Sequence, residues 1–91
     1  MGAAQMRDIV DVSRMLGDET RASIVVALVK GKKSVGELCG DLKLPQPTTS
    51  HHLALLRMSG LVSRERKGKR IFYTLERAKL SPLRDFLAKL K

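Results

Sequence analysis

The stretch from Leu44 to Leu75 constrains the fold of this chain more than any other part of it. It reads as a turn, an amphipathic helix, a strand, a basic turn and a second strand. The helix is expected to begin at Pro47, because the missing N–H of proline costs nothing at a first helical position. It is expected to end near Ser59 and Gly60, since glycine adopts the left-handed conformation that closes helices. The stretch therefore predicts a helix followed by a β-hairpin.

The predicted helix has two chemically different faces. Its inward stripe follows the spacing i, i+3, i+4, i+7 and consists of Thr49, His52, Leu53 and Leu56. Its opposite face carries short or polar side chains, namely Thr48, Ser50, His51, Ala54 and Arg57. Such a helix is suited to the major groove of DNA, because it presents hydrogen-bonding groups on one side while its apolar side packs on the protein.

After Leu61 the sequence alternates with a period of two, which is typical of strands. Two such runs flank Gly68, which supplies the positive φ that a tight hairpin needs. The net charge of the chain is +9, and the excess peaks between residues 45 and 75, which hold six basic side chains and one acidic one. A solvated basic surface explains the sign of this charge, whereas phosphate binding also explains its placement on a hairpin.

Four further helices surround this stretch in the sequence. The apolar spacing predicts them over residues 5–16, 19–30, 35–42 and from Ser81-Pro82 onwards. Asp18 is expected to cap the second helix, and Ser34 with Glu37 forms a capping-box sequence for the third. The second helix is apolar nearly all round, which predicts a place at the centre of the molecule.

These elements predict a single domain over residues 1–91 that is mainly α with a small β-hairpin. Two helices joined by a turn of about four residues form a helix-turn-helix, here over 34–59. The hairpin over 61–75 is the wing that follows it. The expected fold is therefore a winged helix-turn-helix, with about five helices and a two-stranded wing.

The apolar face of the first helix is broad for a small protein, which predicts that part of it packs against a second copy. A chain of 91 residues buries only about 60% of its unfolded surface, so a second copy would supply further burial.

The single cysteine excludes an intrachain disulfide and indicates a reducing compartment. The longest apolar run covers residues 24–29 and is too short to span a bilayer. The charged N-terminal residues also lack the apolar run of a secretory signal. A cytoplasmic protein without a membrane partner is expected.

Four segments of the sequence carry a family resemblance. They are L-G-D-E-T-R at 16–21, V-G-E-L at 35–38, Q-P-T-T-S-H-H-L-A-L-L-R-M-S-G-L-V at 46–62 and G-K-R-I-F-Y-T-L at 68–75. With them the chain resembles the ArsR/SmtB family of winged helix-turn-helix repressors over nearly its whole length. Such proteins are dimers through their first and last helices, and they usually leave operator DNA when an inducer binds. The resemblance therefore implies that residues 1–17 and 78–91 are the dimerisation segments. The interface residues expected there are Met6, Ile9, Val10, Ser13, Leu83, Phe86, Leu87 and Leu90.

The resemblance implies that residues 44–59 are the turn and recognition helix. The contacts with DNA expected there are Gln46, Thr48, Thr49, Ser50, His51 and Arg57. On the wing, the cations expected to reach phosphates or the neighbouring minor groove are Arg64, Arg66, Lys67, Lys69 and Arg70. The chemistry agrees, because glutamine and hydroxyl groups read base edges, whereas cations on phosphates position the protein and carry little sequence information.

The metal sites of the family do not carry over to this sequence. Where arsenic-responsive members cluster thiols at the third helix, this chain has Ser34 and Gly36, and only Cys39 remains. We favour Cys39 as a core residue over a sensor thiol, since its neighbours at helical spacing are aliphatic. The zinc site of the family uses His and carboxylates on the last helix, where residues 79–91 offer only Asp85. No metal or other cofactor is predicted, and the existence of an inducer stays open.

The function expected is that of a sequence-specific regulator of transcription that binds double-stranded DNA, a homodimeric repressor on an inverted-repeat operator. Catalysis is not expected, because the sequence has no glycine-rich phosphate loop and no base placed beside Cys39 or Ser50. Two alternatives keep the fold. One is an architectural DNA-binding protein without sequence preference. The other is a protein-interaction module whose apolar first and last helices hold a different partner.

Overall fold

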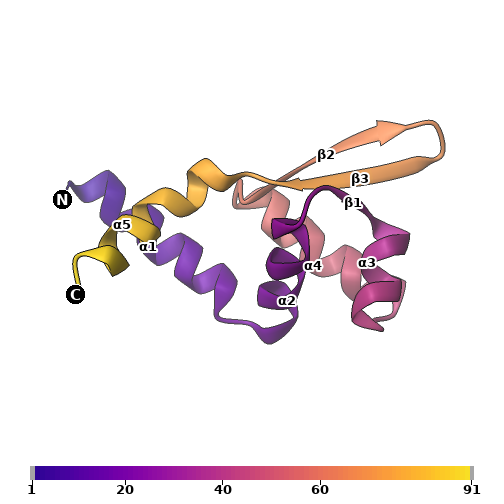
Figure 1. Ribbon diagram of the computed structural model, residues 1–91, viewed down its shortest axis with the longest axis horizontal. Helices are drawn as coiled ribbons and strands as arrows, with labels where there is room; N and C mark the ends of the chain where they lie inside the picture. Colours follow the sequence, from indigo (N-terminus) through magenta and orange to yellow (C-terminus); the bar gives the residue numbers. More distant parts are fainter. Residues whose placement is uncertain (1, 91) are drawn as a thin grey trace.

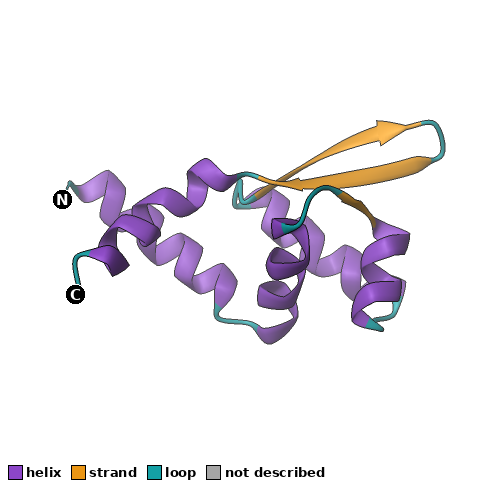
Figure 2. Cartoon of the chain, viewed as in Figure 1, coloured by secondary structure: helices purple, strands orange, loops and turns teal. Residues whose placement is uncertain are grey.

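A computed structural model describes residues 2–90 of the chain (Figure 1). Met1 and Lys91, which end the two predicted dimerisation segments, lie outside the described residues. The elements in chain order are α1 (Ala3–Leu16), α2 (Glu19–Val29), β1 (Lys33–Ser34), α3 (Val35–Leu42), α4 (Gln46–Met58), β2 (Val62–Lys67), β3 (Arg70–Leu75), a 3-10 helix (Arg77–Leu80) and α5 (Ser81–Ala88). The predominance of helices over a small sheet agrees with the prediction (Figure 2).

The main hydrophobic core lies where α2, α3 and α4 meet the base of the sheet. Its fully buried aliphatic side chains are Ile24, Leu28, Leu38, Leu53, Leu56 and Leu61. The helical spacing therefore placed Leu53 and Leu56 correctly. Helix α2 lies in the core as predicted and contributes Ile24, Val25 and Leu28, but its apolar side chains are not all covered, because Val26 remains 64% exposed and Val29 45% exposed. The neighbouring elements cover only one side of this helix.

The first and last helices pack against each other at one end of the elongated molecule, and the wing projects at the other end (Figure 1). Helix α1 begins two residues earlier than expected, because Gln5 Oε1 accepts a hydrogen bond from the N–H of Gly2 at 3.2 Å. Helix α5 begins at Ser81 as expected, but the Ser81 side chain does not cap it. Its hydroxyl donates to the carbonyl of Ala78 at 2.9 Å, since the chain is already helical in the preceding 3-10 turn. No helix within residues 2–90 combines the length and apolarity needed to cross a membrane.

Helices α2 and α3 begin at the predicted caps. Asp18 Oδ2 accepts a hydrogen bond from the N–H of Arg21 at 3.0 Å. Ser34 Oγ accepts from the N–H of Glu37 at 3.1 Å, and Glu37 Oε1 accepts from the N–H of Ser34 at 2.9 Å. These bonds satisfy N–H groups that a helix start otherwise leaves unpaired. The first residue of each of these two helices is thus set by a local capping bond.

The sheet holds three strands in the order β1-β3-β2 among the described residues, one more than predicted. Strand β1 pairs antiparallel with β3, with Lys33 opposite Tyr73 and Ser34 opposite Phe72. Strand β2 pairs with the other edge of β3, and Gly68 turns the hairpin with a φ of 64° as expected. A strand of two residues is too short to produce a pattern of alternation, which is why the sequence did not reveal β1.

Lys43 is the only residue other than glycine with a positive φ within residues 2–90, and it closes α3 at φ 54° and ψ 48°. A left-handed conformation costs an L-residue roughly 1–2 kcal/mol, and glycine loses about 0.5–1 kcal/mol in backbone entropy. We therefore expect Lys43→Gly to raise the free energy of unfolding by up to about 1 kcal/mol in urea titrations. The matched control is Lys30→Gly, where φ is −75° and glycine should destabilise. If the Lys43→Gly protein were less stable than the wild-type protein, the claim that the backbone is strained at Lys43 would be contradicted.

Candidate nucleic-acid interface

Helix α4 separates into a buried and an exposed face as its spacing predicts. Leu53 and Leu56 are fully buried against the core, and Gly60 follows the helix with a φ of 84°. The outer positions Gln46, Ser50, His51 and Arg57 are exposed, and Thr48 and Ala54 are half-buried. The polar groups that would read base edges therefore lie on one accessible side of the helix.

Thr49 is the one predicted DNA contact on α4 that has no exposed surface. Its hydroxyl donates to the carbonyl of Pro45 at 3.1 Å, one helical turn earlier. A buried hydroxyl that is already bonded within its own helix is not available to a base. The hydroxyl of Thr49 is chemically suited to DNA, but the helical spacing points it toward the core. Thr49 is therefore not a DNA contact, contrary to the prediction.

His52 lies on the inner side of α4 and belongs to a polar network. Arg21 Nη1 lies 3.4 Å from His52 Nδ1, and Asp18 Oδ2 lies 3.8 Å from the same nitrogen. The Nε of Arg21 also donates to the carbonyl of Met15 at 2.9 Å. The network joins the end of α1, the start of α2 and the middle of α4. It fixes the orientation of the recognition helix relative to the first helix, while His51 remains exposed on the other side.

The five predicted cations of the wing divide into two groups. Arg64, Arg66 and Lys69 are exposed, and none of them forms an ion pair or a side-chain hydrogen bond with another residue in the range 2–90. Lys67 Nζ, in contrast, lies 3.6 Å from Glu65 Oε1. Arg70 Nη2 donates to Ser34 Oγ at 3.1 Å and to Glu37 Oε1 at 3.4 Å. The first group is free to bind phosphates, whereas the second group already has protein partners.

Lys32 lies beside the wing, although it was not among the contacts predicted from the sequence. Its Nζ lies 3.8 Å from Glu65 Oε1 and 5.6 Å from the centroid of the Phe72 ring. The neighbouring ammonium of Lys67 lowers the pKa of Lys32, and Glu65 partly offsets this effect. The pairing of β1 with β3 brings Lys32 to this place. The Gly31-Lys32-Lys33 run was visible in the sequence, but its pairing with β3 was not.

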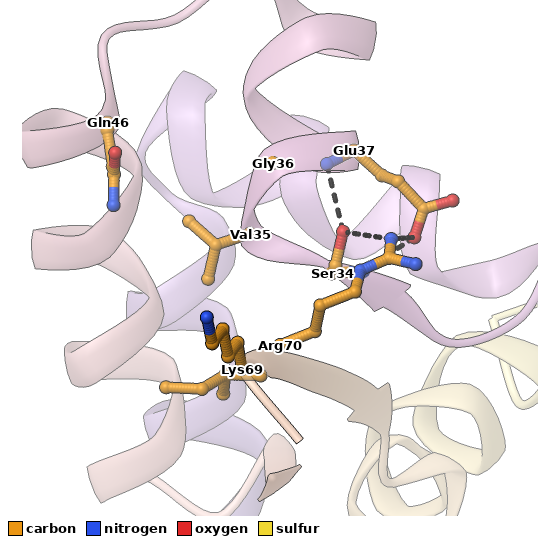
Figure 3. Close-up of a pocket in the computed structure, with 8 residues that line it drawn as sticks. Ser34, Val35, Gly36, Glu37, Gln46, Lys69 and Arg70 are labelled. Carbon is orange, nitrogen blue, oxygen red and sulfur yellow. Dashed lines mark hydrogen bonds and ion pairs between the residues drawn. The ribbon is translucent and has the colours of Figure 1, made fainter. Parts of the chain in front are cut away.

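A hollow of about 490 Å³ lies between the start of α3, the start of α4 and the turn of the wing. Its lining residues are Ser34, Val35, Gly36, Glu37, Gln46, Lys69, Arg70 and Ile71. Figure 3 shows Gln46 on one wall and Lys69 on the opposite wall, with Val35 between them. The folded chain thus places a group suited to reading bases and a free cation on the two sides of one concave surface.

No group of three or more His, Cys, Asp or Glu side chains that could hold a metal ion occurs in the described part of the chain. Cys39 is half-buried on α3, so it is less enclosed than the core interpretation implied. The rings of His51 and His52 meet edge to face with their centroids 5.2 Å apart, and one is exposed while the other is half-buried. The two histidines therefore differ in exposure although their rings are in contact.

The predicted dimer residues differ in how much surface the single chain leaves on them. Met6, Val10, Leu87 and Leu90 are exposed apolar side chains on or next to α1 and α5. Ser13 is exposed, and Leu83 and Phe86 are half-buried. Ile9 is only 7% exposed, because it packs within the chain. Ile9 therefore offers little surface to a second copy, and the remaining residues are the candidates for such a contact.

A helix-turn-helix with a polar outer face on its second helix, followed by a hairpin with a basic turn, defines the winged helix-turn-helix class. Residues 18–64 match the family model described as "Bacterial regulatory protein, arsR family". The chain belongs to this ArsR family. The winged helix-turn-helix predicted from the sequence is confirmed.

Relatives with named functions are regulators of transcription. The "HTH-type transcriptional regulator KmtR" of Mycobacterium tuberculosis is 46% identical over 68 residues, which are 75% of this chain and 52% of the regulator. The "Biofilm growth-associated repressor" of Xylella fastidiosa is 40% identical over 76 residues, which are 84% of this chain and 67% of the repressor. The chain thus spans about half the length of the mycobacterial relative.

Solved structures of similar proteins share the fold over nearly the whole chain. The transcriptional repressor BigR from Xylella fastidiosa has a TM-score of 0.80 and 36% identity, over 96% of this chain and 89% of that protein. HlyU from Vibrio cholerae has a TM-score of 0.79 and 33% identity, over 99% of this chain and 97% of that protein.

Proposed function

We propose that this protein is a sequence-specific regulator of transcription that binds double-stranded DNA as a homodimer and represses from an inverted-repeat operator. The observation that carries the proposal is the shared hollow of Gln46 and Lys69 (Figure 3). Base reading and phosphate binding require polar groups and cations at one surface, and this surface supplies both. Such a regulator would act in the cytoplasm, where bacterial DNA lies, and we assign it no catalytic activity.

The recognition helix and the wing have different roles in this proposal. Gln46, Thr48, Ser50 and His51 contact base edges or nearby phosphates in the major groove, and Arg57 contacts a phosphate. Arg64, Arg66 and Lys69 contact phosphates or the adjacent minor groove, and Lys32 and Lys67 supply further positive charge beside them. The names of two relatives support a role in the regulation of transcription, since KmtR is a regulator and the Xylella protein is a repressor.

A second copy is proposed to bind the apolar face formed by Met6, Val10, Leu87 and Leu90. These side chains are between 46% and 65% exposed in the single chain, and they lie on the two helices that pack at one end of the molecule. Two copies joined there would present two recognition helices. Their operator should hold two half-sites about 10 base pairs, or a multiple of that, between centres.

Binding measurements with selected and random duplexes test the proposal. A duplex is first enriched from a random pool by the purified protein, and gel shifts then compare it with random duplex at several salt concentrations. Specific binders typically gain ~10³ or more in affinity over random sequence. We expect a preference of that order and a footprint with two half-sites. A preference of tenfold or less would favour the architectural alternative, and no DNA binding at all would favour the protein-interaction module.

A further inference from the structure

We infer that Arg70 is a positioning residue, which holds the wing against the first helix of the helix-turn-helix instead of binding a phosphate. The inference rests on the proposed function, because it assigns a role within the same interface. From the sequence alone, Arg70 is expected to be one of the cations that reach DNA. Its neighbours in the folded chain point to the different role.

The side chain of Arg70 turns back from the wing toward α3. Its Nη2 donates to Ser34 Oγ at 3.1 Å and to Glu37 Oε1 at 3.4 Å, and Figure 3 shows both contacts. Its guanidinium carbon also lies 4.8 Å from the centroid of the Phe72 ring, at a distance typical of a cation–π contact. Three partners therefore hold one guanidinium group, which restricts its direction more than a single ion pair would.

The two acceptors of Arg70 are the residues that start α3. Ser34 and Glu37 cap this helix through their mutual hydrogen bonds, and Ser34 also belongs to β1, which pairs with β3. Hydrogen bonding by Ser34 lowers the pKa of Glu37, and the charges of Arg70 and Lys33 lower it further. Glu37 is therefore a carboxylate at neutral pH, able to hold the guanidinium. Arg70 thus connects the base of the wing turn directly to the cap of the helix-turn-helix.

Arg70 and its neighbour Lys69 differ in whether an acidic side chain offsets their charge. The Glu37 carboxylate offsets the charge of Arg70, so the pair adds little to the positive potential that a phosphate meets. Lys69 has no ion-pair partner among residues 2–90 and lies on the wall opposite Gln46. A phosphate at Lys69 would meet an unpaired cation, whereas at Arg70 it would meet a guanidinium whose charge Glu37 already offsets.

The consequence of this contact is geometric. The pair is partly exposed, with 59% and 48% of the two side chains accessible, and such pairs add little to the stability of the fold. The contact instead sets the distance between the wing turn and α4, since both border the same hollow. Without Arg70 the wing keeps its charge on Lys69 and Arg66 but loses a fixed place relative to the recognition helix.

The salt dependence of DNA binding distinguishes a positioning residue from a phosphate contact. Each phosphate contact contributes about 0.9 to the slope of log affinity against log salt concentration. We expect Arg70→Ala to lower affinity for the selected duplex by about 3- to 10-fold while the slope stays unchanged. Lys69→Ala is the matched control, and its slope should fall by about 0.9. A fall of that size in Arg70→Ala would overturn the inference.

Glu37→Gln supplies a second test that does not depend on the truncation of Arg70. Glutamine retains the capping box, so α3 keeps its start. The exchange removes the charge that holds Arg70, and a positioning role predicts a loss of affinity of about 2- to 5-fold with an unchanged slope. If Arg70 were a phosphate contact restrained by Glu37, the variant would bind more tightly and its slope would steepen. That outcome would overturn the inference.

The two levels of the proposal fail in different ways. A wild-type protein that binds no duplex, or that shows no preference among duplexes, overturns the proposed function and the role of Arg70 with it. A wild-type protein with a clear preference and a normal response to Lys69→Ala, combined with a reduced slope in Arg70→Ala, overturns the role of Arg70 alone. Circular dichroism and thermal unfolding of each variant confirm that the compared proteins are folded.

Discussion

Replacing Arg64, Arg66 and Lys69 with alanine is expected to weaken binding to every duplex by roughly 100-fold at about 0.15 M salt. These three cations of the wing have no ion-pair partner among residues 2–90, so their loss leaves no unpaired carboxylate behind. The salt slope should fall by about 2.7, which is the sum of three phosphate contacts. Gel shifts or fluorescence anisotropy over a range of salt concentrations measure both quantities.

The ratio of affinities for the selected and the random duplex separates the wing from the recognition helix. Phosphate contacts carry little sequence information, so this ratio should change little in the triple variant. Lys30→Ala removes an exposed cation outside the proposed interface and serves as the control. An unchanged salt slope in the triple variant would remove the wing from the interface.

The second large effect is expected from Val10→Glu combined with Leu87→Glu. These side chains are 46% and 55% exposed in the single chain, and they lie on the proposed dimer face. Two copies would have to bury four unpaired carboxylates there, which is strongly unfavourable. We expect a monomer in sedimentation velocity. Affinity for a duplex with two half-sites should fall by roughly 100- to 10,000-fold, because the second half-site no longer adds to binding.

A duplex with one half-site should bind this variant as it binds the wild-type protein, since α4 is unchanged. Val26→Glu on α2 is the matched control, because Val26 is 64% exposed and lies outside the proposed dimer face. A double variant that remains dimeric would place the interface elsewhere on the molecule. A monomeric variant with undiminished affinity for two half-sites would show that the dimer does not contribute to recognition.

Local signals in the sequence were sufficient to predict most of the helices and the wing. Asp18, Ser34 and Gly68 each fulfil a requirement of the backbone at their own position, so neighbouring residues suffice to recognise them. The two faces of α4 followed in the same way from helical periodicity. Thr49 was misassigned because its chemistry suits DNA, although the same periodicity turns it into the core.

The features that the sequence did not predict depend on contacts between distant segments. Strand β1 has two residues and exists only because β3 pairs with it. Lys32 therefore reaches the wing, and Arg70 finds acceptors 33 and 36 residues away, without any local pattern that would reveal either contact. The exposure of Val26 has the same origin, since the neighbours of a helix decide which of its apolar faces is covered.

The central claim is that the outer face of α4 lies in the major groove while the wing contacts the flanking phosphates. Titration of the ¹⁵N-labelled protein with the selected duplex, followed by NMR of its backbone amides, tests this claim most directly. We predict the largest shifts at the exposed positions between residues 46 and 57 and between 64 and 70, and small shifts along the outer side of α2. Shifts confined to α1, α2 and α5, with the signals of α4 unchanged, would contradict it.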